Sequence, residues 1–120
     1  YGGGMTEASF VSVEKADNGA VAKIVCPTVG QREAPIIEQE LLAAGPANGW
    51  RIAIDMADVG MLTSVGIGAL VTINKKCRDG KGRMVLFGLN STIMEVLKLT
   101  RLDKLFPIKN DRDAALKALK

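Results

Sequence analysis

Residues 50–77 read WRIAIDMADVGMLTSVGIGALVTINKKC, and this stretch decides the fold. Residues 50–56 predict a β-strand, because every second position is apolar, at Ile52, Ile54 and Met56. A loop over 57–63 follows. Residues 65–77 predict a helix, because its apolar positions recur at helical spacing, at Leu70, Ile73 and Cys77. A strand that leads through a short loop into a helix is typical of α/β proteins.

Towards the N-terminus, two strands are predicted over 9–15 and 20–26. Asp17-Asn18-Gly19 lies between them and contains a strong hairpin signal. Residues 27–32 then predict a loop. A helix is expected to begin near Pro35, since proline is tolerated in a first helical turn, and to end at Gly45-Pro46.

Towards the C-terminus, the pattern predicts a strand over 83–88 and a helix over 91–99, capped by Asn90 or Ser91. A short strand over 105–108 and a last helix capped by Asp111 complete the chain. The order is β-β-α-β-α-β-α-β-α. This alternation predicts an α/β fold in which a mixed, mostly parallel sheet is flanked by about four helices.

The length of 120 residues and the hydrophobic content of 48% suit one domain with its own core. Tyr1-Gly-Gly-Gly before Met5 is typical of an expression remnant, so we expect residues 1–8 to be a tag remnant with a flexible N-terminus. Residues 9–120 are the expected domain.

The net charge of +3 is mild. The densest basic cluster has no interleaved aromatic residues and is interpreted as a solvated helix end rather than a nucleic-acid site; it comprises Lys75, Lys76, Arg78, Lys81 and Arg83. No apolar run approaches the ~18 residues of a membrane span, and the start lacks a signal-peptide pattern. We therefore expect a cytoplasmic location, with no membrane insertion and no nucleic-acid partner.

Enzymatic chemistry is poorly supported. The chain has no histidine, so it lacks the commonest general base near neutral pH. It contains neither a Gly-rich phosphate loop nor a zinc ligand set, and Cys26 and Cys77 are interpreted as small buried thiols. We expect a binding module with no catalytic residue, no metal and no cofactor.

A pair of hydroxyl side chains, Thr63 and Ser64, precedes the helix at 65–77. Gly66 and Gly68 follow in its first turn, where each costs about 1 kcal/mol relative to alanine. The simplest interpretation is that Ser64 is an ordinary helix cap, worth about 1 kcal/mol, and that the glycines allow tight packing of the helix on the sheet. The alternative is that the glycines leave the backbone open so that another molecule can approach the hydroxyl.

The segments IDMADVGMLTSVGIGALVTINKKC and LNSTIMEVLKLTRLDKLFPI resemble the phosphorylation segment and the penultimate helix and last strand of STAS domains, the fold of bacterial anti-sigma factor antagonists. The resemblance implies that Ser64 is the phosphorylated residue, with Thr63 as the alternative. It places the surface that binds the partner, an anti-sigma factor with serine kinase activity, on Asp55, Thr63, Ser64, Val65, Gly66 and Gly68.

Three features of the sequence depart from the family pattern. Thr63 stands where the family has an aspartate before the phosphorylated serine, Pro27-Thr28-Val29-Gly30 replaces the usual Gly-Glu-Leu-Asp, and Arg101 replaces a glycine. These departures leave open a second reading. In it the domain is a non-switching scaffold or a cytoplasmic accessory of a stress-sensing assembly or of a lipid or anion transporter. Oligomeric state cannot be read from the sequence.

Overall fold

The computed structural model describes residues 10–120, and its centre is a five-stranded sheet with strand order β1-β2-β4-β6-β7. The strands are β1 (Val11–Ala16), β2 (Gly19–Ile24), β4 (Arg51–Asp55), β6 (Arg83–Phe87) and β7 (Ile108–Lys109). The first two pair antiparallel and the other neighbours pair parallel. The predicted hairpin and mostly parallel sheet are therefore confirmed. The expected tag remnant at residues 1–8 lies outside the described residues.

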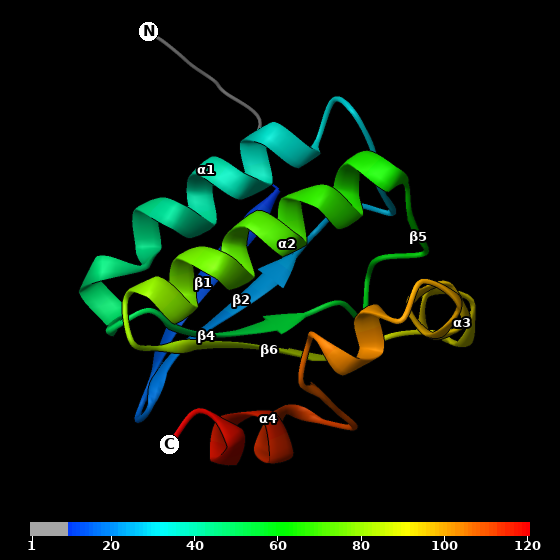
Figure 1. The fold of residues 1–120 in the computed structure, drawn as a ribbon. Coiled ribbons are helices and arrows are strands. Elements are labelled where there is room, and N and C mark those ends of the chain that lie inside the picture. The colour runs from blue at the N-terminus through cyan, green and yellow to red at the C-terminus, as the bar shows by residue number, and fades with distance from the viewer. Residues whose placement is uncertain (1–9) are drawn as a thin grey trace, which may run out of the picture.

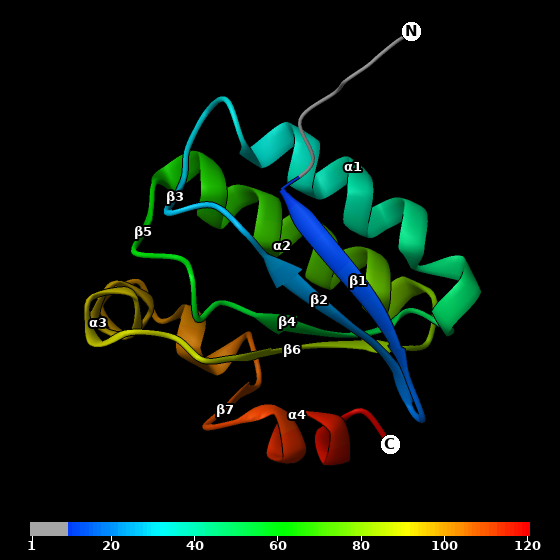
Figure 2. The same ribbon diagram turned by 180° about the vertical axis from the view of Figure 1, so that it is seen from behind.

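Helices cover both faces of this sheet. Figures 1 and 2 show α1 (Ala34–Ala44) and α2 (Ser64–Asp79) side by side over one face, with α4 (Arg112–Ala118) against the opposite face. The remaining helix, α3 (Ser91–Leu99), lies at the end of the sheet near the start of α2 (Figure 1). This arrangement confirms an α/β fold with four helices.

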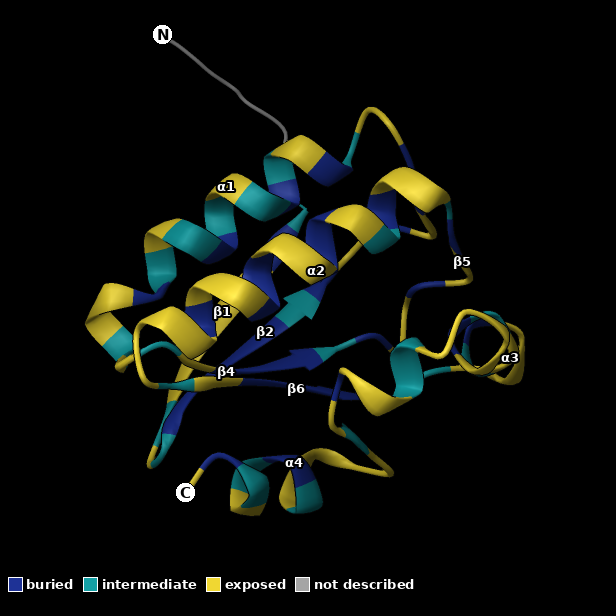
Figure 3. Ribbon diagram, viewed as in Figure 1, coloured by how far each residue is buried: buried dark blue, intermediate teal, exposed yellow. Residues whose placement is uncertain are grey.

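The central strand β4 shows why two helical layers are needed. Ile52 and Ile54 belong to a core cluster beneath α1 and α2, whereas Ala53 belongs to a second cluster with Ala115 and Leu119 from the C-terminal segment. All three strand residues are at most 1% exposed, so both faces of the strand are covered (Figure 3). Parallel strands buried on both faces are a general property of sheets in α/β proteins.

Two predicted loops contain extra structure. β3 (Thr28–Val29) and β5 (Met61–Leu62) form a separate two-stranded parallel pair, where the sequence predicts the loops 27–32 and 57–63. Each strand has only two residues, so neither carries a detectable alternation of apolar positions. We refer to this pair as the β3–β5 ribbon.

The segment after α3 also differs from the prediction. Residues 105–108 were expected to form a strand, but a short 3-10 helix spans Leu102–Lys104 and β7 begins only at Ile108. Arg101, at the family's glycine position, keeps a left-handed conformation with φ +62°. A non-glycine residue pays a steric cost of roughly 1–2 kcal/mol there, which the surrounding fold must offset.

Helix ends follow the predicted caps. The Asn90 side chain accepts a hydrogen bond from the Ile93 N–H at 2.8 Å, which selects Asn90 rather than Ser91 as the cap of α3. Asp111 caps α4 in the same way, through the Ala114 N–H at 2.8 Å. Side-chain caps of this kind contribute about 1 kcal/mol each.

Both cysteines are buried free thiols, as predicted. Burial raises the pKa of the Cys77 thiol from 9.0 to about 11, and burial also raises the pKa of Cys26, with a smaller contribution from Glu33. Because the thiolate is the nucleophile, both side chains are poorly reactive in the folded chain.

We predict that Cys26 and Cys77 react slowly with a thiol reagent at pH 8 and rapidly once the chain is unfolded in urea. A two-unit rise in pKa reduces the thiolate fraction of Cys77 about a hundredfold, and its burial adds a steric block. Lys76→Cys, which adds an exposed thiol one residue away on α2, should react rapidly and serves as the control. Two native thiols that react as fast as this added one would contradict the prediction.

Candidate functional site

The start of α2 is held by the side chain of Thr63. Its Oγ1 donates a hydrogen bond to the Val29 carbonyl at 3.0 Å and accepts one from the Gly66 N–H at 3.4 Å. The Thr63 N–H donates to the same Val29 carbonyl at 3.1 Å. Thr63 is therefore the N-cap of α2 and also fastens the helix to the β3–β5 ribbon.

Ser64 is the first residue of α2, one position after the cap. Its side chain is exposed, and within residues 10–120 its hydroxyl has no hydrogen-bond partner. Of the two adjacent hydroxyl groups, the one on Thr63 is half-buried and used twice, whereas the one on Ser64 is free. The ordinary capping role belongs to Thr63, so capping does not account for Ser64.

Apolar side chains are exposed on both sides of Ser64. Met61, at the start of β5, is 54% exposed and Val65, the next residue of α2, is 43% exposed. In Figure 3 the start of α2, next to β5, carries both exposed and buried segments. The free hydroxyl of Ser64 therefore lies near two exposed apolar side chains in the sequence, Met61 and Val65.

The two glycines of the first turn have different roles. A Cβ added at Gly66 would lie 2.5 Å from the Val29 carbonyl oxygen and 2.9 Å from a Val29 methyl, so Gly66 is required for close packing on the ribbon. A Cβ at Gly68 would meet nothing within 4 Å. The expectation of an open backbone therefore holds for Gly68, which is exposed, and is wrong for Gly66, which is buried. The assignment of both to partner binding stays a prediction.

Asp55 lies apart from this group, at the end of β4. Its Oδ1 accepts a hydrogen bond from the Ala57 N–H at 2.9 Å, and it lies close to Gly88. No hydrogen bond joins Asp55 to Thr63 or Ser64 among the described residues. Asp55 therefore shapes the loop after β4, and its part in partner binding stays a prediction.

The residues that hold Thr63 in place could not be identified from the sequence. Val29 supplies the carbonyl, and the Gly30 N–H donates to Glu33 Oε1 at 3.1 Å, which fixes the turn between β3 and α1. A Cβ at Gly30 would lie 3.6 Å from the Thr63 methyl, so this turn lies against the start of α2. The signal was only a two-residue β-branched pair, Thr28-Val29, inside an expected loop.

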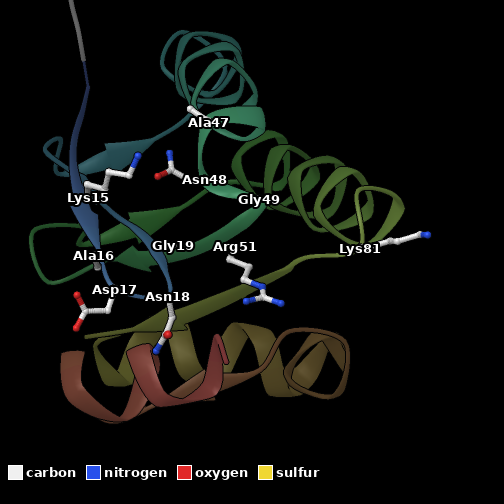
Figure 4. A pocket seen from close by; sticks show the side chains of 10 residues that line it. All are labelled: Lys15, Ala16, Asp17, Asn18, Gly19, Ala47, Asn48, Gly49, Arg51 and Lys81. Carbon is white, nitrogen blue, oxygen red and sulfur yellow. The ribbon is translucent and has the colours of Figure 1, made fainter.

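A separate hollow of about 360 Å³ lies beside the turn of the β1–β2 hairpin (Figure 4). Arg51 reaches into it, but the side chains of Lys81 and Asp17 point away from its centre, and the Asn48 amide is bonded to the Ala44 carbonyl at 2.8 Å (Figure 4). Its polar groups do not converge on a common point. The described residues also contain no cluster of three metal-ligating side chains and no helix long and apolar enough to cross a membrane.

The fold and the sequence place the chain in a known family. The STAS domain profile matches residues 37–115, about two-thirds of the chain, so the chain belongs to the STAS domain family. It is similar to the anti-sigma-B factor antagonist of Listeria monocytogenes, with 25% identity over 100 residues, 83% of this chain and 88% of the relative.

Two solved structures show the same architecture. An anti-sigma factor antagonist from Mycobacterium paratuberculosis is 27% identical, with a TM-score of 0.79 over 91% of this chain and 92% of that one. The phosphorylated form of the Bacillus cell fate determinant SpoIIAA is 13% identical, with a TM-score of 0.69 over 92% of this chain and 99% of that one, a likeness of fold alone. The family resemblance and the fold predicted from the sequence are thus confirmed.

We predict that alanine substitutions at the two glycines change stability in opposite directions. Gly66→Ala should destabilise the chain by more than about 1 kcal/mol, because its methyl group would be forced against the Val29 backbone. Gly68→Ala should stabilise it by about 0.5–1 kcal/mol, because alanine is the better helix former and the space is open. The free energy of unfolding of each variant is measured by urea titration, provided that its dependence on urea concentration keeps the native slope. If Gly68→Ala destabilised the chain, the open space assigned to Gly68 would be contradicted.

Proposed function

We propose that this chain is an anti-sigma factor antagonist controlled at Ser64. In its unmodified form it binds an anti-sigma factor with serine kinase activity, which frees a sigma factor for transcription in the cytoplasm. Phosphorylation of Ser64 by that partner then releases the complex. The single observation that carries this proposal is the exposed, unbonded hydroxyl at the first position of α2 in a STAS domain.

The geometry favours Ser64 over Thr63 as the phosphate acceptor. In the transfer, the hydroxyl oxygen would attack the γ-phosphorus of ATP in the partner's active site, ADP would leave, and the hydroxyl proton would pass to a base of the partner, so the oxygen must be accessible. The Thr63 oxygen is bonded to Val29 and Gly66, and freeing it would detach α2 from the ribbon. The Ser64 oxygen can react without breaking any contact of the fold.

A phosphate on Ser64 is compatible with this fold. The N–H groups of Ser64 and Val65 lie in the first turn of α2, where no earlier turn can accept their hydrogen bonds. Together with the helix dipole they favour an anion at this end. The modified domain should therefore keep its fold, and the effect of phosphorylation should fall on the partner.

Release follows from the charge and size of the phosphate. It adds about −1.5 to −2 charge where Met61 and Val65 present apolar side chains to the partner. A partner surface shaped for a small hydroxyl would have to accommodate the group and desolvate its charge. A loss of about 3 kcal/mol would weaken binding roughly 150-fold, which is enough to reverse a competition between two partners.

This proposal assigns no catalysis to the chain itself. ATP and its magnesium ion would be held by the kinase, and the chain contributes the accepting hydroxyl and the surface around it. The proposal is supported by the names of the Listeria and Mycobacterium relatives as anti-sigma factor antagonists.

We predict that Ser64→Ala keeps partner binding but accepts no phosphate, whereas Ser64→Asp weakens binding about 100-fold through its added charge. The tagged chain would be isolated from its native host, the bound protein identified by mass spectrometry, and its dissociation constants measured by calorimetry. Phosphate transfer would be followed with ATP and magnesium, and the modified residue located by mass spectrometry.

Ala47→Asp is the control. Ala47 is exposed in the 3-10 helix Pro46–Asn48, which precedes β4, so this variant adds the same charge at the opposite end of the central strand from Ser64. It should leave binding unchanged. Tight binding by Ser64→Asp would contradict the switch, and recovery of a transporter subunit without phosphate transfer would instead favour the scaffold alternative.

A further inference from the structure

Asn74 is the only polar residue that is buried among residues 10–120, at 4% exposure. It lies in the middle of α2, on the buried side of that helix with Leu70, Ile73 and Cys77. Within the described residues its side-chain amide makes no hydrogen bond. The residue is buried as a whole, but neither polar atom of its amide is fully enclosed, so both reach solvent and remain available to a ligand.

The amide lines a surface groove. Two adjoining hollows of about 340 and 420 Å³ share Asn74, Arg78 and Leu105. The first continues along α2, and the second runs between α2 and the segment before β7; the other lining residues are Val71, Lys75, Asp79, Gly82, Arg83, Met84 and Pro107. No described polar side-chain atom is both fully enclosed and unpaired, so the amide keeps its small exposure towards this groove.

The walls of the groove combine positive charge with apolar surface. Lys75 and Arg78 are exposed and form no ion pair within residues 10–120, and Asp79 is the one acidic residue of the lining. Val71 and Leu105, which line the same hollow as the amide, are both 37% exposed. The groove therefore offers an amide donor and acceptor at its floor, unpaired cations on one wall and two apolar contacts.

We propose that this groove docks a short, extended segment of a partner protein that carries a carboxylate next to an aliphatic side chain. The Asn74 amide would bond the N–H and C=O groups of the segment's main chain, and Arg78 and Lys75 would bind the carboxylate. The aliphatic side chain would cover Val71 and Leu105. A small inorganic anion would satisfy the cations but would leave these apolar contacts uncovered.

The groove is a second site, independent of Ser64. Asn74 lies ten residues further along α2, about 15 Å at the rise of an α-helix. This separation exceeds the ~8 Å Debye length at physiological ionic strength, so a phosphate on Ser64 should have little effect on a carboxylate in the groove. Docking here would therefore persist in the phosphorylated chain.

The test uses peptides with the isolated chain labelled with ¹⁵N. The probe is acetyl-Gly-Leu-Asp-Val-Glu-Gly-amide, compared with the same peptide carrying Asn and Gln, or two lysines, at the acidic positions. Sodium phosphate and sodium acetate form two further arms. We expect saturable amide shifts confined to residues 71–79 and 105–107, with the acidic peptide binding at least fivefold more tightly than either analogue.

Variants separate the groove from general charge. Arg78→Glu should weaken binding of the acidic peptide at least tenfold and Asn74→Leu at least fivefold. Two controls should bind the acidic peptide within twofold of the native chain. Lys117→Glu makes the same charge change at an exposed position of α4, on the other face of the sheet, and Ser64→Asp adds charge at the proposed switch. Equal binding of the lysine peptide, equal shifts with phosphate or acetate, or unchanged binding by both groove variants would overturn the proposal. None of these outcomes bears on the Ser64 switch, which is measured with the whole partner.

Discussion

Burial of both faces of β4 is the constraint from which the rest of the structure follows. A strand covered on both sides requires a helical layer on each, and parallel neighbours require connections that cross over those layers. The chain meets both requirements by placing α1 and α2 over one face and α4 over the other. The crossover that leads out of β4 then brings the start of α2 to the end of the sheet where the β3–β5 ribbon lies, and so it positions Ser64.

The β3–β5 ribbon fixes the position of the start of α2. A helix start on a long loop would be mobile, yet here the Val29 carbonyl accepts hydrogen bonds from both the N–H and the hydroxyl of Thr63. Gly66 allows the ribbon to approach the helix backbone closely. Thr63 and Gly66 make these contacts, so Ser64 takes no part in holding α2 against the β3–β5 ribbon. A residue that holds nothing in place can be modified without loss of the fold.

α2 thus supports two surfaces of different chemistry. Its first turn presents a hydroxyl between apolar side chains, where added charge would be unfavourable for a partner. Its middle presents an unbonded amide beside unpaired cations, where negative charge would be favourable. The two proposals therefore place a contact that depends on modification and one that does not on the same helix, more than a Debye length apart.

The sequence by itself determined the order of the elements and the α/β class, because period-two apolar runs such as residues 50–56 and helical stripes such as Leu70, Ile73 and Cys77 each report burial within one element. The sequence also placed Ser64 at the start of a helix and indicated the family of the chain. It did not separate the roles of Thr63 and Ser64, or of Gly66 and Gly68, because these depend on Val29, which lies 34 residues before Thr63 and meets it only through the tertiary fold. The unbonded amide of Asn74 was equally hidden, since hydrogen bonding and burial are properties of neighbours in space, and only the folded chain assigns those neighbours.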